Sequence, residues 1–266
     1  MIVTQEKRRR FLIEALRKEQ PEYADIEIPA DEAGQKKLLR AFLNVRVPMP
    51  AKAEFLEVQD AYLKEETRKK GIVTLAALKP SRSGIYLWKG DITTLACDVI
   101  VNAANSQMLG CFCPNHGCID NQIHTFSGVQ LRLACAELMK EQGFSEPTGT
   151  AKITPAYNLP CKYVIHTVGP IIQGRLTRRD EELLASCYRA CLGLAEQNGV
   201  RSIAFCCIST GEFHFPPEKA AEIAVKTVND YKEQTNRQME VIFNVFKERD
   251  YDIYQRLLAA DCPAEV

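Results

Sequence analysis

The sequence predicts an α/β protein in which a largely parallel sheet is covered by helices on both faces, preceded by a helical extension. From about residue 72 onward, short apolar runs rich in β-branched and aromatic residues alternate with segments of helical spacing. Such alternation is typical of a largely parallel sheet. Before residue 72 the apolar residues recur with a helical period, and prolines separate the stretches. We therefore expect an N-terminal helical extension over residues 1–71 and a main domain over residues 72–266.

The individual elements follow from the period of the apolar residues. In the extension, apolar stripes near the 3.6-residue period begin at Phe11, Leu38 and Phe55, and predict helices. In the main domain, strands are predicted at 85–92, 97–105, 150–157, 162–168, 202–209 and 240–246, and helices at 119–142, 178–198 and 217–233. Ligands of such sheets bind at the carboxyl ends of the strands.

The composition excludes several classes of protein. Hydrophobic residues make up 46% and charged residues 26% of the 266, a balance typical of globular proteins. Lys and Arg total 34 and Asp and Glu total 34, so no overall field attracts nucleic acid or an acidic membrane surface. No apolar stretch of about 18 residues occurs, which argues against a membrane span. We expect a cytoplasmic protein without nucleic-acid or membrane partners, in which any anionic ligand is held locally.

The cysteines and histidines gather in the main domain. Ten of the 11 cysteines lie between residues 97 and 207, and all four histidines lie between residues 116 and 214. Without an export signal, these cysteines are expected to stay reduced thiols. They are then either core residues or metal ligands.

One loop concentrates these side chains after the predicted strand at 97–105. Within eight residues it contains Cys111, Cys113, His116 and Cys118. Thiolates and imidazoles suit zinc, and three protein donors with an open position are typical of a catalytic zinc site. The spacing differs from that of a structural zinc finger. The residues alone leave open which three of the four bind, and also leave open that these are ordinary cysteines beside a surface histidine.

Two further segments can bind a nucleotide-like ligand. Ser209, Thr210 and Gly211 form a small-residue turn between a strand and a helix, where converging backbone N–H groups can hold a phosphate. Asp91, in the turn after the first predicted strand, can accept hydrogen bonds from a nucleobase amine or a ribose hydroxyl. Asn105 can both donate to and accept from a sugar.

Taken together, these motifs resemble those of the macrodomain family, whose members bind ADP-ribose. The motifs are GDIT at 90–93, VNAAN at 101–105, HTVGP at 166–170 and STGEFHFP at 209–216, in the order expected of that family. The loop GCFCPNHGCIDNQIH at 110–124 is similar to that of zinc-containing macrodomains of microbial pathogens, which are protein-ADP-ribosyl hydrolases. The resemblance implies a three-layer α/β/α sandwich with a mixed, mostly parallel sheet.

The resemblance also implies roles for single residues. Asp91 and the backbone of Ile92 would take the adenine end, and Asn105 the distal ribose. The diphosphate would lie on the backbone of Ser209, Thr210, Gly211, Glu212 and Phe213. Zn²⁺ would be bound by Cys111, His116 and Cys118, with Cys113 left out. Asp120 and Asn105 would be the catalytic residues, with Asp120 orienting a water molecule or acting as base.

The predicted function is zinc-dependent hydrolysis of the glycosidic bond between ADP-ribose and a protein side chain. A zinc ion with an open position can polarise an oxygen or activate water. The expected partners are ADP-ribose and an ADP-ribosylated protein, and the resemblance suggests a lipoyl-carrier protein. Two alternatives stay open: a non-catalytic ADP-ribose reader with a structural zinc, and a thiol enzyme that uses a loop cysteine with His116 or His124 as base.

Overall fold

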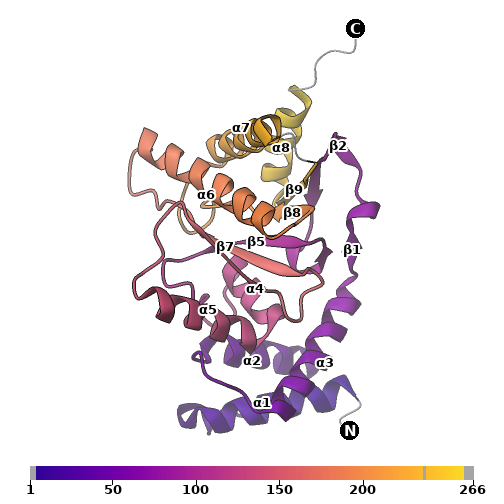
Figure 1. The fold of residues 1–266 in the computed structure, drawn as a ribbon. Coiled ribbons are helices and arrows are strands. Elements are labelled where there is room, and N and C mark those ends of the chain that lie inside the picture. The colour runs from indigo at the N-terminus through magenta and orange to yellow at the C-terminus, as the bar shows by residue number, and fades with distance from the viewer. Residues whose placement is uncertain (1–3, 236–237, 261–266) are drawn as a thin grey trace.

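The computed structural model describes residues 4–235 and 238–260. A seven-stranded sheet lies between two layers of helices, and three further helices from the N-terminus lie beyond one of these layers (Figure 1). Within the described ranges, no helix has the length and apolar character that crossing a bilayer requires.

The sheet has the strand order β2-β3-β9-β8-β5-β7-β6. Its strands are β2 (Pro80–Arg82), β3 (Ile85–Lys89), β5 (Val99–Ala104), β6 (Ala151–Pro155), β7 (Tyr163–Val168), β8 (Ser202–Phe205) and β9 (Glu240–Val245). The five central strands pair in parallel, and both edge strands pair antiparallel to their neighbours. The predicted mixed, mostly parallel sheet is confirmed. A short ladder of β1 (Val73–Thr74) and β4 (Leu95–Ala96) stands apart from it.

Helices α6 (Arg178–Gln197), α7 (Pro217–Thr235) and α8 (Glu248–Ala260) cover one face of the sheet. Helices α4 (Ile119–Ser127) and α5 (Val129–Gln142) cover the other. The single helix expected over 119–142 was wrong, because Gly128 interrupts it with a φ of 97°. A side chain there would also meet Gln59, whose Nε2 would lie 2.6 Å from an added Cβ.

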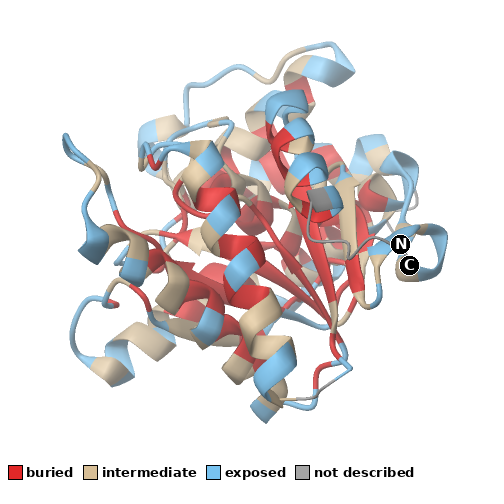
Figure 2. Cartoon of the chain, turned by 90° about the horizontal axis from the view of Figure 1, so that it is seen from above, coloured by how far each residue is buried: buried red, intermediate tan, exposed pale blue. Residues whose placement is uncertain are grey.

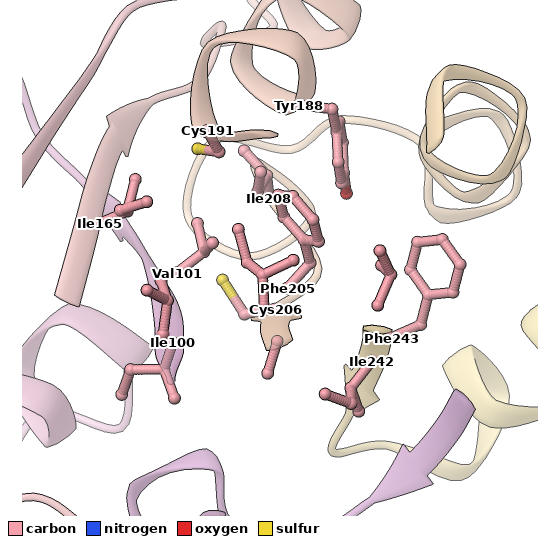
Figure 3. Close-up of a cluster of buried hydrophobic side chains, with 14 of the residues drawn as sticks. Ile100, Val101, Ile165, Tyr188, Cys191, Phe205, Cys206, Ile208, Ile242 and Phe243 are labelled. Carbon is pink, nitrogen blue, oxygen red and sulfur yellow. The ribbon is translucent and has the colours of Figure 1, made fainter. Parts of the chain in front are cut away.

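The buried residues concentrate on the strands and on the inner sides of the covering helices, as Figure 2 shows. Cysteines are part of this core. Cys191 of α6 and Cys206 after β8 lie among Ile165, Ile208 and Phe205, with no metal-ligating partner set around them in the described residues (Figure 3). These two cysteines therefore act as small apolar core residues.

The N-terminal extension forms helices α1 (Gln5–Glu19), α2 (Glu32–Val45) and α3 (Ala53–Lys70), with a 3-10 turn at Pro21–Tyr23 between the first two. Thr4 and Asp31 cap the first two helices by accepting backbone N–H groups. The apolar sides of the helices form a cluster of their own, which Val129 of α5 joins. Helices α2 and α3 pack against α4. The division of the chain at residue 71 stays a prediction.

Candidate functional site

The parallel strands bring the predicted site residues to one edge of the sheet. Asn105 follows β5, the turn at Ser209 comes after β8, and Asp91 comes two residues after β3. Because the carboxyl ends of parallel strands meet at the same edge, these segments share one side of the molecule.

The loop between β5 and α4 begins with a close contact that only glycine allows. Gly110 has a φ of 79°, and a Cβ placed there would lie 2.8 Å from Cγ of His124. A side chain would therefore be strained by the backbone and would also strike the imidazole ring. Gly110 therefore packs directly against the ring of His124, a residue of α4.

The loop gathers Cys111, His116 and Cys118. Their ligand atoms all lie within 4.8 Å of one another, and each residue is half-buried. Sγ of Cys111 lies 3.6 Å from Nδ1 of His116. Sulfur and nitrogen bound at tetrahedral angles to one zinc, with bonds of about 2.3 and 2.0 Å, would be about 3.5 Å apart. Both the donor types and this spacing fit a zinc ion. Cys113 is exposed and does not belong to the group.

Cys118 combines two local roles at the start of α4. It is the N-cap residue, and its Sγ accepts the backbone N–H of Asn121 at 3.4 Å. Burial raises the pKa of its thiol to about 12. A nearby cation would favour the thiolate, which is the form that binds a metal.

Asp120 lies in the first turn of α4, directly below the loop. Its side chain is buried, and burial raises the pKa of the carboxyl group to about 6, while a hydrogen bond from Asn102 acts in the opposite direction. Nδ2 of Asn102 donates to Oδ1 at 2.8 Å, and Nδ2 of Asn105 lies 3.5 Å from Oδ2. A carboxyl group with a pKa near neutrality, fixed by amide donors, is suited to accept a proton.

Asn105 connects this carboxylate to the loop. Its Nδ2 also donates to the carbonyl oxygen of Gly110 at 3.2 Å, and its Oδ1 accepts the backbone N–H of Gln107 at 3.0 Å. The two predicted catalytic residues, Asn105 and Asp120, therefore lie side by side, and Asn105 contacts the start of the segment that carries the three candidate ligands.

The turn at Ser209 has the backbone of an anion site. Ser209 adopts a φ of 64°, which is costly for a non-glycine residue, and its buried hydroxyl has no hydrogen-bond partner among the described residues. In the same described part of the chain, the backbone N–H groups of Gly211, Glu212 and Phe213 donate to no protein acceptor. Gly169, after β7, lets Ser209 approach, because an added Cβ would lie 2.0 Å from the Ser209 hydroxyl.

The loop that carries the candidate ligands Cys111, His116 and Cys118, called here the metal-ligating loop, contacts the turn at residues 209–213, called here the anion turn. Nε2 of His116 lies 3.5 Å from a carboxylate oxygen of Glu212. The group of Cys111, His116 and Cys118 is therefore adjacent to the segment predicted to hold the diphosphate.

The Macro domain family model matches residues 101–224, which include the metal-ligating loop and the anion turn. A protein-ADP-ribose hydrolase of Treponema medium is 60% identical over 97% of this chain and 100% of its own length. The chain belongs to the macrodomain family. A protein-ADP-ribose hydrolase of Staphylococcus aureus strain MRSA252 is 48% identical over 94% of this macrodomain chain and 95% of its own. A Trypanosoma brucei macrodomain crystallised in complex with ADP-ribose is 31% identical, with a TM-score of 0.63, over 82% and 94% of the two chains.

At the opposite end of the site, the macrodomain carries Asp91 as the N-cap of a 3-10 turn at Ile92–Thr94. Oδ1 of Asp91 accepts from the N–H and hydroxyl of Thr93, and Oδ2 pairs with Nζ of Lys70 at 2.8 Å. These partners lower the pKa of Asp91, although burial opposes them. The side chain of Ile92 is buried, so only its backbone can meet a ligand.

Sequence reasoning missed several residues at this edge of the macrodomain. Phe246 follows β9 and is 78% exposed, beside the strand that leads to Asp91. An exposed aromatic residue at the end of a predicted strand was the available signal. Lys70 of α3 and Arg40 of α2, which contacts the metal-ligating loop, gave no signal, because charged helix residues are ordinary on a surface.

Proposed function

We propose that this macrodomain is a zinc-dependent protein mono-ADP-ribosyl hydrolase that removes ADP-ribose from modified protein side chains. Relatives at 60% and 48% identity over nearly the whole chain are named protein-ADP-ribose hydrolase, which supports the hydrolase activity. The zinc dependence is supported by the grouping of Cys111, His116 and Cys118.

One contact in the structure supports the proposed role of zinc, which membership of the family alone does not. Nε2 of His116 lies 3.5 Å from Glu212, so the metal-ligating loop and the anion turn belong to one site. A diphosphate bound at the turn would place the attached ribose near His116 and Asp120. A zinc site without a substrate role would not need this adjacency.

The binding roles follow from the placement of the groups. The backbone from Ser209 to Phe213 would hold the diphosphate, with the free N–H groups of Gly211, Glu212 and Phe213 as donors. Asp91 and the backbone of Ile92 would meet the adenine, and the exposed ring of Phe246 can stack on a base. Asn105 would hold the distal ribose, next to Asp120.

The chemistry requires a water molecule to attack C1″ of the ribose. Asp120, whose pKa is about 6, is mostly ionised at neutral pH and can take the proton that the water loses. The bond between C1″ and the protein side chain breaks, the leaving side chain takes up the proton that Asp120 accepted from the water, and ADP-ribose is released. Amide donors from Asn102 and Asn105 keep the carboxylate in place during this step.

Zinc would be held by Cys111, His116 and Cys118, and when bound it supplies a Lewis-acid charge beside the scissile bond. Glu212 can accept a hydrogen bond from His116 Nε2, which would leave Nδ1 to face the ion. The protein substrate that we propose is a lipoyl-carrier protein, and its modified side chain would enter from the loop side.

The test is release of ADP-ribose from a mono-ADP-ribosylated protein, measured with and without a zinc chelator. We expect release to stop with the chelator and to return when zinc is added. Equal release in both would reject the role of zinc and leave a metal-free hydrolase. ADP-ribose binding without release from any modified protein, including a lipoyl-carrier protein, would instead identify a reader.

A further inference from the structure

The N-terminal helices reach the metal-ligating loop through two polar side chains of α2. Nη2 of Arg40 donates to the backbone carbonyl of His116 at 2.6 Å and to Oδ1 of Asn121 at 2.8 Å. Asn44, one turn further along, accepts the backbone N–H of Asn115 at 2.9 Å and donates to Thr125. The extension thus contacts the loop at the neighbouring residues Asn115 and His116, and α4 at Asn121 and Thr125.

Asn121 forms further hydrogen bonds to other residues of the loop. It is fully buried, and its Nδ2 donates to the carbonyl oxygens of Cys111 at 3.3 Å and Cys113 at 3.0 Å. Its own backbone N–H donates to Sγ of Cys118. All three metal-ligating residues are therefore one hydrogen bond away from Asn121 or Arg40.

Arg40 also determines which way the Asn121 amide points. Both Nη2 and Nε of the guanidinium donate to Oδ1, at 2.8 and 3.3 Å. If the amide were turned over, its NH₂ group would face these donors, and its oxygen would face two carbonyl oxygens. The amide is therefore fixed in the orientation that binds the loop. The half-buried guanidinium in addition places a positive charge near the thiols of Cys111 and Cys118.

We propose that Arg40 and Asn121 form a clamp that sets the spacing of Cys111, His116 and Cys118, and that the N-terminal extension is for this reason an integral part of the metal site. The clamp rests on the proposed zinc-dependent function. Arg40 and Asn121 are positioning residues, because a guanidinium has no acceptor atom and Oδ1 of Asn121 already accepts from Arg40.

The physical reason is the preorganisation of an irregular loop. Between β5 and α4 the chain makes few backbone hydrogen bonds of its own, and both Gly110 and Asn115 adopt positive φ angles. A loop of this kind orders at an entropic cost when it binds a ligand, unless other contacts hold it beforehand. Outer-sphere partners of metal ligands typically change metal affinity by about 10–100-fold.

The test compares zinc affinity in the full chain, by competition with a chromophoric chelator. We expect Arg40→Met to weaken zinc binding by about 10–100-fold. Arg40→Lys keeps the charge but cannot donate from two nitrogens to one oxygen, so we expect an intermediate loss. Lys37→Met removes an exposed positive charge from the same helix and is the matched control, with unchanged affinity.

A second measurement needs no metal. In zinc-free protein we expect hydrogen exchange of residues 111–121 to be faster in Arg40→Met than in the wild type or in Lys37→Met, while the central strands exchange as before. This also shows whether the variant is folded. Unchanged zinc affinity in Arg40→Met, whatever the exchange shows, would overturn the clamp while leaving the hydrolase intact.

The outcomes separate the two proposals. A wild type that binds no zinc in the competition contradicts the zinc-dependent function, and a clamp for a metal site is then wrong as well. A wild type that binds zinc, beside an Arg40→Met variant that binds it equally, contradicts the clamp alone.

Discussion

Two groups of cysteine and histidine residues in this macrodomain have similar composition and different surroundings. Cys111, His116 and Cys118 lie on the loop before α4 and are half-buried. His124, Cys135 and His166 lie on α4, α5 and β7 and are buried. In both groups the ligand atoms come within 4.8 Å of one another. Residue type and proximity alone therefore do not distinguish a metal site from a part of the core.

The clearest difference is burial. Both ring nitrogens of His166 are also engaged, whereas those of the buried His124 have no hydrogen-bond partner among the described residues. In the buried group, Nδ1 of His166 is 3.1 Å from Nδ2 of Asn102, and Nε2 is 3.0 Å from the hydroxyl of Thr154. Burial lowers the pKa of His166 to about 3 and raises that of Cys135 to about 12, so both are neutral at pH 7. The buried group is a neutral polar part of the core. The loop group faces solvent and the anion turn, and its thiols can lose protons to a metal.

The largest expected effect comes from removing a donor of the loop group. In Cys111→Ala or His116→Ala we expect hydrolysis to fall by more than about 100-fold, because a lost ligand should matter more than an outer-sphere partner. Release of ADP-ribose from a modified protein and zinc content measure this. The loop is outside the core, so circular dichroism should be unchanged. Full activity in either variant would contradict the ligand assignment.

Asp120 lies between the two groups, and its substitution tests with which of them it acts. Its Oδ1 is 3.5 Å from Nε2 of His124, and it follows Cys118 by two residues. In Asp120→Asn we expect kcat to fall by about 100-fold, as for loss of a general base, with little change in ADP-ribose binding. Steady-state kinetics and calorimetry measure the two effects. A loss of binding with unchanged kcat would show that Asp120 holds the ligand instead.

The buried histidines predict a loss of stability in acid. The pKa of His166 falls from its usual 6.5 to about 3 in the folded protein, and that of His124 also falls well below its usual value, because burial disfavours the charged form. Below pH 6.5 the unfolded chain binds protons that the folded chain does not. His166 should therefore lower the free energy of unfolding by about 1.4 kcal/mol per pH unit between pH 6 and pH 4, and His124 should act in the same direction.

Urea unfolding of the zinc-free protein at several pH values measures this dependence. His166→Asn, which does not titrate in this range, should show a smaller slope than the wild type. A slope that stays the same in this variant would mean that His166 is already charged in the folded state.

Cys135→Ala gives the smallest effect and completes the comparison. Removing a buried sulfur should lower the free energy of unfolding by about 1–2 kcal/mol, as for a small core cavity. Zinc content should remain that of the wild type, in contrast to Cys111→Ala. Loss of zinc from Cys135→Ala with the fold intact would show that the buried group also binds the metal.

Much of the fold could be predicted because its signals are local. Strands such as β5 and β9 are mostly apolar runs, and α6 shows a clear helical period. The break at Gly128 was missed because a single glycine within a helical pattern does not reveal its φ. Helix α8 was also missed, although Tyr251, Tyr254 and Leu258 have helical spacing.

In the candidate site, too, residues with a local signal could be predicted and long-range contacts could not. The three donors Cys111, His116 and Cys118 could be found from the sequence because they lie within eight residues of one another. The contact between His116 and Glu212 joins residues 96 positions apart, and Arg40 reaches His116 across 76 positions. No local pattern encodes such pairs.

By itself, the sequence determined most strand and helix segments, the loop that carries Cys111, His116 and Cys118, and the small-residue turn, since each depends on the chemistry and period of neighbouring residues. Only the tertiary structure decided that the loop meets the anion turn, that Lys70 and Arg40 of the extension reach this edge of the sheet, and that His124, Cys135 and His166 are core residues. The order of the parallel strands and the packing of α2 and α3 on α4 bring these distant segments together, and long-range packing of this kind has no signature within a short window of sequence.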